Sequence, residues 1–351
     1  MAVRSLTATP AQSHVRVSVL VPARNAADTL EAALDSVLAT PDVPLELLVV
    51  DDDSRDETRA MVEGIASRDR RVRLLSGVGR GIAAALNQAL HVAQGDFVAR
   101  MDADDLSDPA RLGAQLDHFA LDASERIGAL GTQVSVFGSE PTDGFRRFLE
   151  WQNGLLTAAE HARDLFIDSP LCHPSVMLRR ATLLAVGGYR EGDFAEDYDL
   201  FLRLHRAGLT LEKLPRVLLQ WRRHERQTTF TDPRLSPERM RALKVSHLAP
   251  LLAAHPLRAR RRLVLWGAGR DGKRFARALT SAGQRPDNFV DVDPRKIGQT
   301  VHGARVLPME DLRLGHDHVV AAVGSVGARE LIRAYLLNEG FVEGHDFVVV
   351  A

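Results

Sequence analysis

Three features are scarce in this chain of 351 residues, and each scarcity excludes a class of protein. The single cysteine, Cys172, cannot form a disulfide within the chain, which fits a reducing compartment. The formal net charge is -1, so there is no electrostatic case for a nucleic-acid binder. No apolar run approaches the roughly 20 residues of a membrane helix, and residues 1–13 show no hydrophobic signal core. We expect a cytoplasmic protein without nucleic-acid partners, and we leave open its oligomeric state and peripheral association with the inner face of the membrane.

Short β-rich segments alternate with helical segments over the first hundred residues. Strands are expected at 15–21, 45–50, 72–75 and 97–101, with a helix between each pair. This alternation predicts an α/β fold with a mostly parallel central sheet that helices cover on both faces. Such sheets bind ligands at the carboxyl ends of their strands, so a functional site is expected at that edge.

Two of these strands end in acidic residues. The strand at 97–101 runs into Asp102-Ala103-Asp104-Asp105, and the strand at 45–50 runs into Asp51-Asp52-Asp53. Two carboxylates spaced as in Asp102 and Asp104 can hold a hard divalent cation and leave its other positions free for phosphate oxygens. Carboxylates this close repel one another unless a cation or a proton lies between them. The pattern indicates a nucleotide-diphosphate site, and an acidic strand end without metal is the plainer alternative.

The remaining sequence indicates a linker and a second unit. We expect a flexible N-terminus at 1–14, a first α/β unit at 15–230, a helical linker at 231–262 and a smaller α/β unit at 263–351. The linker helix begins at Ser236-Pro237, a capping residue followed by a first-turn proline.

The last unit opens with an apolar strand that leads into a glycine-rich turn. Gly267, Gly269 and Gly272 have the spacing Gly-x-Gly-x-x-Gly, a helix follows, and Asp291 stands at the end of the next strand. In this context the glycines bring backbone N–H groups at a helix start close to a pyrophosphate. The order predicts a Rossmann-like domain with a second nucleotide site at these four residues. A packing or oligomerisation domain without ligand is the alternative.

A series of short motifs follows along residues 15–230. In chain order they are Val21-Pro22-Ala23-Arg24-Asn25, Val49-Val50-Asp51-Asp52, Arg80-Gly81-Ile82-Ala83-Ala84-Ala85-Leu86-Asn87, Ala99-Arg100-Met101-Asp102-Ala103-Asp104-Asp105, His173-Pro174-Ser175-Val176-Met177, Gly187-Gly188-Tyr189, Ala195-Glu196-Asp197-Tyr198-Asp199-Leu200 and Arg222-Arg223-His224. Each motif is weak alone, but in this order they resemble a family-2 glycosyltransferase with the GT-A fold. One position departs from the family, because Asp53 stands where glycine is usual.

The resemblance implies a metal-dependent, inverting glycosyltransferase. It would move a sugar from a nucleotide-diphosphate sugar, with UDP-sugars favoured, to a glycan or lipid-linked acceptor in cell-surface polysaccharide synthesis. The metal, Mn²⁺ or Mg²⁺, is expected on Asp104 and Asp102, with His224 as a further ligand. Asp52 matches the position that reads the nucleobase. The full set that the resemblance implies for the nucleotide sugar is Pro22, Arg24, Asn25, Asp51, Asp52, Arg80, Asn87, Asp102, Arg222 and Arg223.

The resemblance also implies the catalytic residues. Asp197 matches the general base, which would take the proton of the acceptor hydroxyl in a single displacement, and Glu196 would orient it. His173 is expected on the acceptor side. The plainer alternatives are a carboxylate stabilised by the dipole of a helix start for Asp197, and a structural histidine at position 173.

Functions of other classes fit the sequence less well. A sugar-nucleotide-binding oxidoreductase that uses the C-terminal Rossmann-like unit is the main alternative, but no Tyr/Lys or His-centred hydride site stands near the glycine turn. A nucleotidyltransferase would need a glycine- and lysine-rich phosphate loop near the N-terminus, and the sequence has none there. A lectin-like scaffold would not need the complete acidic set.

Overall fold

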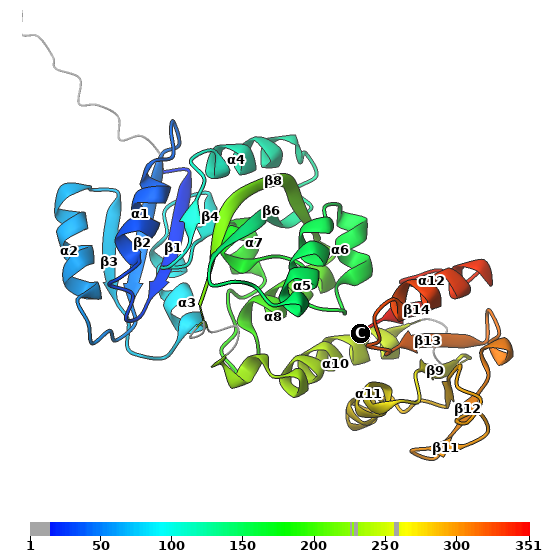
Figure 1. Ribbon diagram of the computed structural model, residues 1–351. Coiled ribbons are helices and arrows are strands. Elements are labelled where there is room, and N and C mark those ends of the chain that lie inside the picture. The colour runs from blue at the N-terminus through cyan, green and yellow to red at the C-terminus, as the bar shows by residue number, and fades with distance from the viewer. Residues whose placement is uncertain (1–14, 225–226, 228–230, 256–259) are drawn as a thin grey trace, which may run out of the picture.

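The computed structural model describes residues 15–224, 227, 231–255 and 260–351 (Figure 1). The expected flexible N-terminus, 1–14, lies outside the described residues. Two sheets organise the chain, one of eight strands and one of six. We call the part built on the first sheet the larger unit and the part built on the second sheet the C-terminal unit. Among the described helices, none combines the length and apolar character that crossing a bilayer requires.

The larger unit is built on a sheet with the strand order β3-β2-β1-β4-β7-β6-β8-β5. Its strands are β1 (Val17–Ala23), β2 (Leu45–Asp51), β3 (Val72–Ser76), β4 (Phe97–Arg100), β5 (Leu106–Ser107), β6 (Ile127–Gly138), β7 (Met177–Arg179) and β8 (Thr210–Arg223). β1 and β2 are rich in valine and leucine and buried on both faces, as parallel strands between helices are. β3, β2, β1 and β4 pair in parallel, as do β6 and β8, whereas β7 and β5 are antiparallel to their neighbours. The prediction of an α/β fold with a mostly parallel sheet is confirmed.

Helices pack on both faces of this sheet (Figure 1). They are α1 (Leu30–Leu38), α2 (Thr58–Arg68), α3 (Ile82–Val92), α4 (Arg111–Leu121), α5 (Asp143–Gly154), α6 (Ala158–Asp164), α7 (Arg180–Ala185) and α8 (Glu196–Arg206), with a short 3₁₀ turn, η1 (His173–Ser175). α3 packs on β1 and β2 through the buried side chains of Ala83, Ala85 and Ala89, which are small enough for a close approach. α6 begins with a capping box between Thr157 and Glu160.

The C-terminal unit has the strand order β11-β12-β10-β9-β13-β14. Its elements are β9 (Arg262–Trp266), α11 (Arg270–Ser281), β10 (Asn288–Val290), β11 (Thr300–Val301), β12 (Ala304–Leu307), η3 (Met309–Asp311), β13 (Asp317–Ala321), α12 (Ala328–Asn338) and β14 (Phe347–Val349). All neighbouring strands are parallel except β11, which is antiparallel to β12. The first strand, β9, lies at the centre with strands added on both sides, which is the order of a doubly wound sheet.

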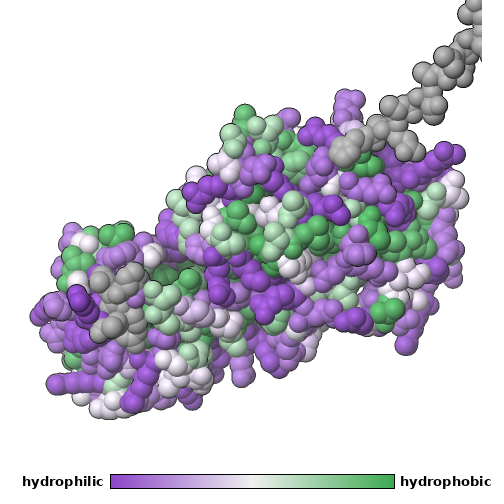
Figure 2. Space-filling view, turned by 180° about the vertical axis from the view of Figure 1, so that it is seen from behind, coloured by the Kyte–Doolittle hydropathy of each residue, from purple (hydrophilic) through white to green (hydrophobic). Residues whose placement is uncertain are grey.

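A long helix, α10 (Pro237–Ala254), joins the two units after the short turn η2 (Pro233–Leu235). Its start is capped by the side chain of Ser236, as the sequence predicts. α10 packs on α8 of the larger unit and on α11 of the C-terminal unit. Ile167 and Trp151 of the larger unit pack against the core of the C-terminal unit. Seen from behind, hydrophilic side chains cover much of the surface, and hydrophobic side chains lie between them in small groups (Figure 2).

Candidate active site

A cleft of about 1110 Å³ opens where the expected acidic strand ends meet. It brings together residues that are far apart in the sequence: Asp52 after β2, Asp104 after β4 and Asp197 in the first turn of α8. Of the residues predicted from the sequence, those that line this cleft are Pro22, Arg24, Asn25, Asp52, Asp102, Asp104, His173, Glu196, Asp197, Arg222 and His224.

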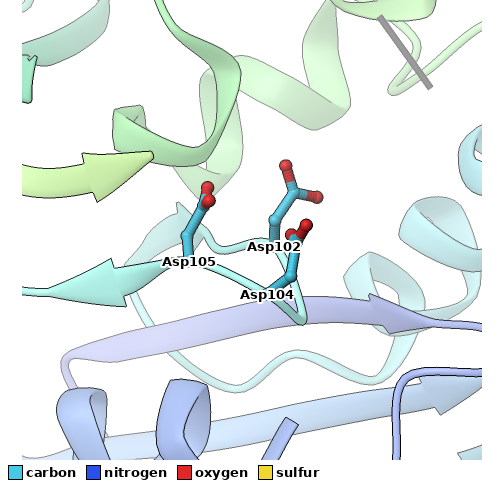
Figure 3. Close-up of side chains that lie close together, drawn as sticks. All are labelled: Asp102, Asp104 and Asp105. Atoms are coloured by element: carbon cyan, nitrogen blue, oxygen red, sulfur yellow. The ribbon is translucent and has the colours of Figure 1, made fainter. Parts of the chain in front are cut away.

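Three carboxylates crowd together in the loop between β4 and β5. Oxygen atoms of Asp102, Asp104 and Asp105 all lie within 4.8 Å of one another, and Figure 3 shows the three side chains extending to the same side of the loop. Burial and then the charge of Asp102 raise the pKa of Asp104. Burial and both neighbouring aspartates raise the pKa of Asp105 well above its usual range. The loop therefore concentrates negative charge that the protein only partly neutralises.

The protein groups that face this cluster leave oxygen atoms available. The buried Arg100 lies 2.5 Å from Asp102, and His224 Nε2 lies 3.2 Å from Asp104 Oδ2. Asp105 Oδ1 accepts the backbone N–H of Arg222 at 2.7 Å, while its buried Oδ2 has no partner among the described residues. Clustered carboxylate oxygens are the donors that Mg²⁺ and Mn²⁺ prefer. The chemistry of this donor set therefore fits a hard divalent cation.

On the nucleotide side of the cleft, Asp52 holds a glycine-rich loop. Its two carboxylate oxygens accept the backbone N–H groups of Gly79 and Gly81, each at 2.8 Å. Both glycines have a positive φ, 73° and 91°, which side chains rarely adopt. Each carboxylate oxygen of Asp52 keeps a further lone pair, so Asp52 can also accept a hydrogen bond from a ligand.

The departure at position 53 has a structural explanation. Asp53 has a φ of 64°, in the left-handed region where glycine is common. Aspartate tolerates this region better than most residues. Asp53 can therefore adopt the backbone turn at which the family usually has glycine.

Four residues predicted for the nucleotide sugar are not among those that line the cleft. Asp51 is buried and accepts the backbone N–H of Ser54. Arg80 forms an exposed ion pair with Glu191 at 2.7 Å.

The other two residues of this group also have protein partners. The amide of Asn87 forms two hydrogen bonds with the backbone of Tyr189, at 2.6 and 2.9 Å. Arg223 packs over the ring of Phe145 and donates to the carbonyl of Glu140. The structure does not bring these side chains to the expected ligand.

Asp197 has the environment of a poised base. It lies at the start of α8, partly accessible from the cleft, and its Oδ1 accepts the N–H of Tyr198 at 2.7 Å. Desolvation by the surrounding protein, and then the charge of Glu196, raise the pKa of Asp197 to about 7. Glu196 is buried beside it and pairs with Arg234 at 3.2 Å. A carboxylate with a pKa near neutral pH is suited to accept a proton in a reaction.

His173 lies in the wall of the cleft as a neutral side chain. It is buried, and its Nε2 lies 3.1 Å from the hydroxyl of Tyr189. Burial and the nearby charge of Arg100 hold the pKa of His173 well below its usual range. An imidazole in this state can position a neighbour through a hydrogen bond but carries no charge.

The sequence interpretation missed two buried arginines that support the acidic loop. Arg100 pairs with Asp102, although it stands in a strand expected from its apolar character. Arg111 is fully buried and donates to the carbonyls of Pro174, at 2.6 Å, and Arg100, at 3.3 Å. A charged residue at the end of an otherwise apolar strand, two positions before Asp102, was the available signal for Arg100.

In the C-terminal unit, the glycine turn and Asp291 are bonded to each other. Asp291 Oδ2 accepts the N–H of Ala268 at 2.8 Å and the Lys296 ammonium at 3.0 Å, and its Oδ1 accepts the N–H of Asp293 at 3.0 Å. A Cβ atom at Gly272 would lie 1.8 Å from the carbonyl oxygen of Gly267, so this position excludes any side chain. The glycines therefore permit close packing of α11 on β9, and Asp291 holds the turn.

Comparison with known proteins gives the family. Residues 18–186 match the family described as Glycosyl transferase family 2. The putative glycosyltransferase EpsE of Bacillus subtilis (strain 168) is 30% identical over 215 residues, which cover 60% of this chain and 74% of that protein. The chain therefore belongs to glycosyltransferase family 2, and it is a glycosyltransferase with the GT-A fold.

Two further proteins are similar over part of the chain. An Escherichia coli protein, the UDP-Glc:alpha-D-GlcNAc-diphosphoundecaprenol beta-1,3-glucosyltransferase WfgD, is 43% identical over 91 residues, which cover 26% of this chain and 35% of that protein. The crystal structure of S. aureus TarS 1-349 in complex with UDP-GlcNAc is similar with a TM-score of 0.54 and 20% identity, covering 75% of this chain and 71% of that chain. At this identity the likeness to TarS concerns the fold.

Proposed function

We propose that this protein transfers a sugar, with inversion, from a nucleotide-diphosphate sugar to a hydroxyl group of a glycan or lipid-linked acceptor in cell-surface polysaccharide synthesis. UDP-sugars are the favoured donors. The observation that carries the proposal is the convergence of Asp52, Asp104 and Asp197 on one cleft. The name of the relative WfgD, which specifies a UDP-sugar donor and a lipid-linked acceptor, supports the choice of both substrates.

Asp197 is the proposed general base. Its carboxylate takes the proton of the acceptor hydroxyl as that oxygen bonds to the anomeric carbon and the bond to the diphosphate breaks. One displacement of this kind inverts the configuration at the anomeric carbon. Desolvation and then the charge of Glu196, which pairs with Arg234, raise the pKa of Asp197 and so the proton affinity of the base.

Asp104 and Asp102, together with His224, are the residues that would hold Mn²⁺ or Mg²⁺. When bound, such a cation neutralises the charge that grows on the leaving diphosphate. Arg222 supports this loop from β8, because its Nε donates to the carbonyl of Asp104 at 2.7 Å and its N–H binds Asp105. Its guanidinium group adds positive charge to the wall of the cleft next to the acidic loop.

The C-terminal unit has no assigned chemistry in this proposal. Asp291 accepts three hydrogen bonds from the protein, two of them on Oδ2, which supports a structural role more than recognition of a ribose. Nucleotide binding at Gly267, Gly269, Gly272 and Asp291 therefore stays a prediction, and so does an oxidoreductase function. The domain limits expected from the sequence and association with the membrane also stay predictions.

The donor and the metal are tested together by thermal unfolding with Mn²⁺ and a panel of nucleotide sugars. A donor that binds the native protein raises the unfolding temperature by mass action. One combination of nucleobase and sugar should therefore give the largest increase. We expect Asp104→Ala to abolish the Mn²⁺-dependent shift and to lower transfer at least about 100-fold. Asp117→Ala removes an exposed carboxylate on α4 and serves as the matched control. Unchanged activity of Asp104→Ala would contradict the metal role.

A further inference from the structure

The cleft extends across the sheet beyond the part assigned to the donor. Asp52 follows β2, the acidic loop follows β4, and Trp221 lies on β8, which is separated from β4 by β7 and β6. All of these residues line the same cleft. We call the part at the ends of β1, β2 and β4 the donor half, and the part lined by α5, residues 168–174 and β8 the acceptor half.

Three aromatic residues form one wall of the acceptor half, and we call them the aromatic wall: Phe145, Phe148 and Trp221. Phe145 and Phe148 stand three positions apart on α5 and so share a face of that helix. The ring centroids of Phe145 and Trp221 are 5.3 Å apart, and those of Phe145 and Phe148 are 6.2 Å apart. Phe145 is only 8% exposed and backs the wall, whereas Phe148 and Trp221 stay part-exposed.

Such a wall is unusual in a chain with only 5% aromatic residues. Large aromatic side chains are normally covered in a core, since burying them removes apolar area from water. Here Phe148 and Trp221 keep part of their surface open, although the rest of the cleft is rich in polar groups. An apolar surface beside polar groups is the arrangement that binds a ligand with one apolar face and several hydroxyl groups.

The polar groups of the acceptor half are those that bind a neutral, hydroxylated ligand. Asp168 and Ser169 line it beside Gln152, and Asp168 Oδ1 accepts the N–H of Ser169 at 2.8 Å. Among the described residues that line it, those of α5 and 168–174 include no lysine or arginine, and Arg222 of β8 is bonded to Asp104 and Asp105 of the acidic loop. Lys213 lies behind this wall, where its ammonium group binds the carbonyls of Gln152 and Pro170. Asp168 interacts electrostatically with Lys244 of α10 and exposes part of its carboxylate to the cleft, which disfavours an acceptor whose only group here is a phosphate.

We propose that the aromatic wall binds the terminal pyranose ring of a carbohydrate acceptor. The C–H face of the ring stacks on Phe148 and Trp221, its hydroxyl groups bind Asp168, and this pose turns one hydroxyl toward Asp197 in the same cleft. An open-chain polyol phosphate has no ring face to stack and brings its charge to Asp168. This inference rests on the transferase function proposed above and adds the class of acceptor to it.

Saturation-transfer NMR of the full chain with UDP and Mn²⁺ tests the acceptor class. The probes are methyl β-D-glucopyranoside, methyl β-D-galactopyranoside and methyl N-acetyl-β-D-glucosaminide, with ribitol 5-phosphate as the open-chain comparison. We expect saturation of the ring protons of at least one glycoside and none for ribitol 5-phosphate. Phe148→Ala should weaken glycoside binding about three- to ten-fold, which is the usual contribution of one aromatic contact. The UDP signal should stay unchanged.

Two controls separate this inference from general damage to α5. Phe148→Tyr keeps a ring and should retain glycoside binding, and Arg147→Ala alters the exposed neighbouring position on the same helix and should have no effect. Binding of ribitol 5-phosphate alone, no saturation of any glycoside, or equal glycoside binding by wild type and Phe148→Ala would overturn the inference. Saturated glycosides without a UDP signal would count against the proposed donor and would leave the aromatic wall supported.

Discussion

At the scale of single residues, the site depends on where carboxylates are desolvated. Asp197 and Asp104 both have a raised pKa, but for different purposes. Asp104 lies among other carboxylates that suit a cation, whereas Asp197 lies beside the carboxylate of Glu196 and accepts the backbone N–H of Tyr198. The first arrangement suits the binding of a cation, and the second suits a proton acceptor near neutral pH.

The pKa of Asp197 sets the expected pH dependence of transfer. The base must be ionised, so kcat/KM should rise as the pH passes through about 7 and then level off. A carboxylate with an ordinary pKa would give a flat profile from pH 5 to 8. Asp197→Asn should lower transfer roughly 10²- to 10⁴-fold and retain donor binding. Initial rates from pH 5 to 9 and calorimetry with the donor measure both.

The raised pKa of Asp197 should also lower the stability of the folded protein above neutral pH. Because its pKa is higher in the folded chain than the usual 3.8, the folded state loses stability as the pH rises from about 4 to about 7 and then stays lower. Asp197→Asn removes this loss, so its unfolding free energy should exceed that of wild type by roughly 1–3 kcal/mol at pH 8 and by little at pH 4. Urea unfolding at both pH values gives the comparison. Equal stability of the two proteins at pH 8 would show that Asp197 is not desolvated.

Sequence patterns predicted which residue types gather at the site. They did not predict the conformations of long, flexible side chains. Asp52, Asp104 and Asp197 have short side chains fixed to strand and helix ends, so their positions follow from the topology. The side chain of Arg80 has many rotamers, and its ion pair with Glu191 depends on a loop 111 residues later. No spacing rule within the sequence gives that contact.

At the scale of elements, the regular alternation of strands and helices was predictable from the sequence. The elements that depend on contacts with distant parts of the chain were not. The strands and helices up to β4 follow from local periodicity. α5 was not predicted from the sequence, because its apolar side chains face the cleft and the C-terminal unit, which only the folded chain brings near. β8 runs from Thr210 to Arg223 and continues past Pro215, because its register against β6 shifts at that proline.

α3 offers a test of a residue whose predicted and observed roles differ. Asn87 was expected at the nucleotide sugar, but its amide binds both backbone groups of Tyr189 and so fixes the turn beside His173. Asn87→Ala leaves these two backbone groups without partners, and we expect a loss of about 1–3 kcal/mol in unfolding free energy. The Kd of the donor should not change, which calorimetry can measure.

A matched control lies next to Asn87 on the same helix. Gln88 makes one exposed hydrogen bond, to the carbonyl of Ser76, so Gln88→Ala should change stability by less than about 1 kcal/mol. If Asn87→Ala instead weakens donor binding and leaves stability unchanged, the nucleotide contact expected from the sequence would be right and the structural role wrong.

At the scale of the whole molecule, the C-terminal unit supports the aromatic wall that we propose as the acceptor site. Arg333 of α12 lies 2.5 Å from Asp164 at the end of α6 and 2.9 Å from Glu343. Asp164 is 2% exposed and also accepts the indole N–H of Trp151 at 2.8 Å. Trp151 is on α5, the helix that presents Phe148 and Gln152 to the cleft. One buried carboxylate therefore links the C-terminal unit to the acceptor half.

This link predicts a mutation far from the cleft that affects acceptor use alone. Arg333→Leu removes one partner of a buried carboxylate, so unfolding free energy should fall by roughly 2–4 kcal/mol. If the junction holds α5 in place, the KM for the acceptor should rise several-fold while the Kd of the donor, which binds across the sheet, stays unchanged. Arg277→Leu, at an exposed position of α11, is the matched control. Equal weakening of donor and acceptor would indicate general loosening of the fold, and an unchanged acceptor KM would show that the aromatic wall does not depend on the C-terminal unit.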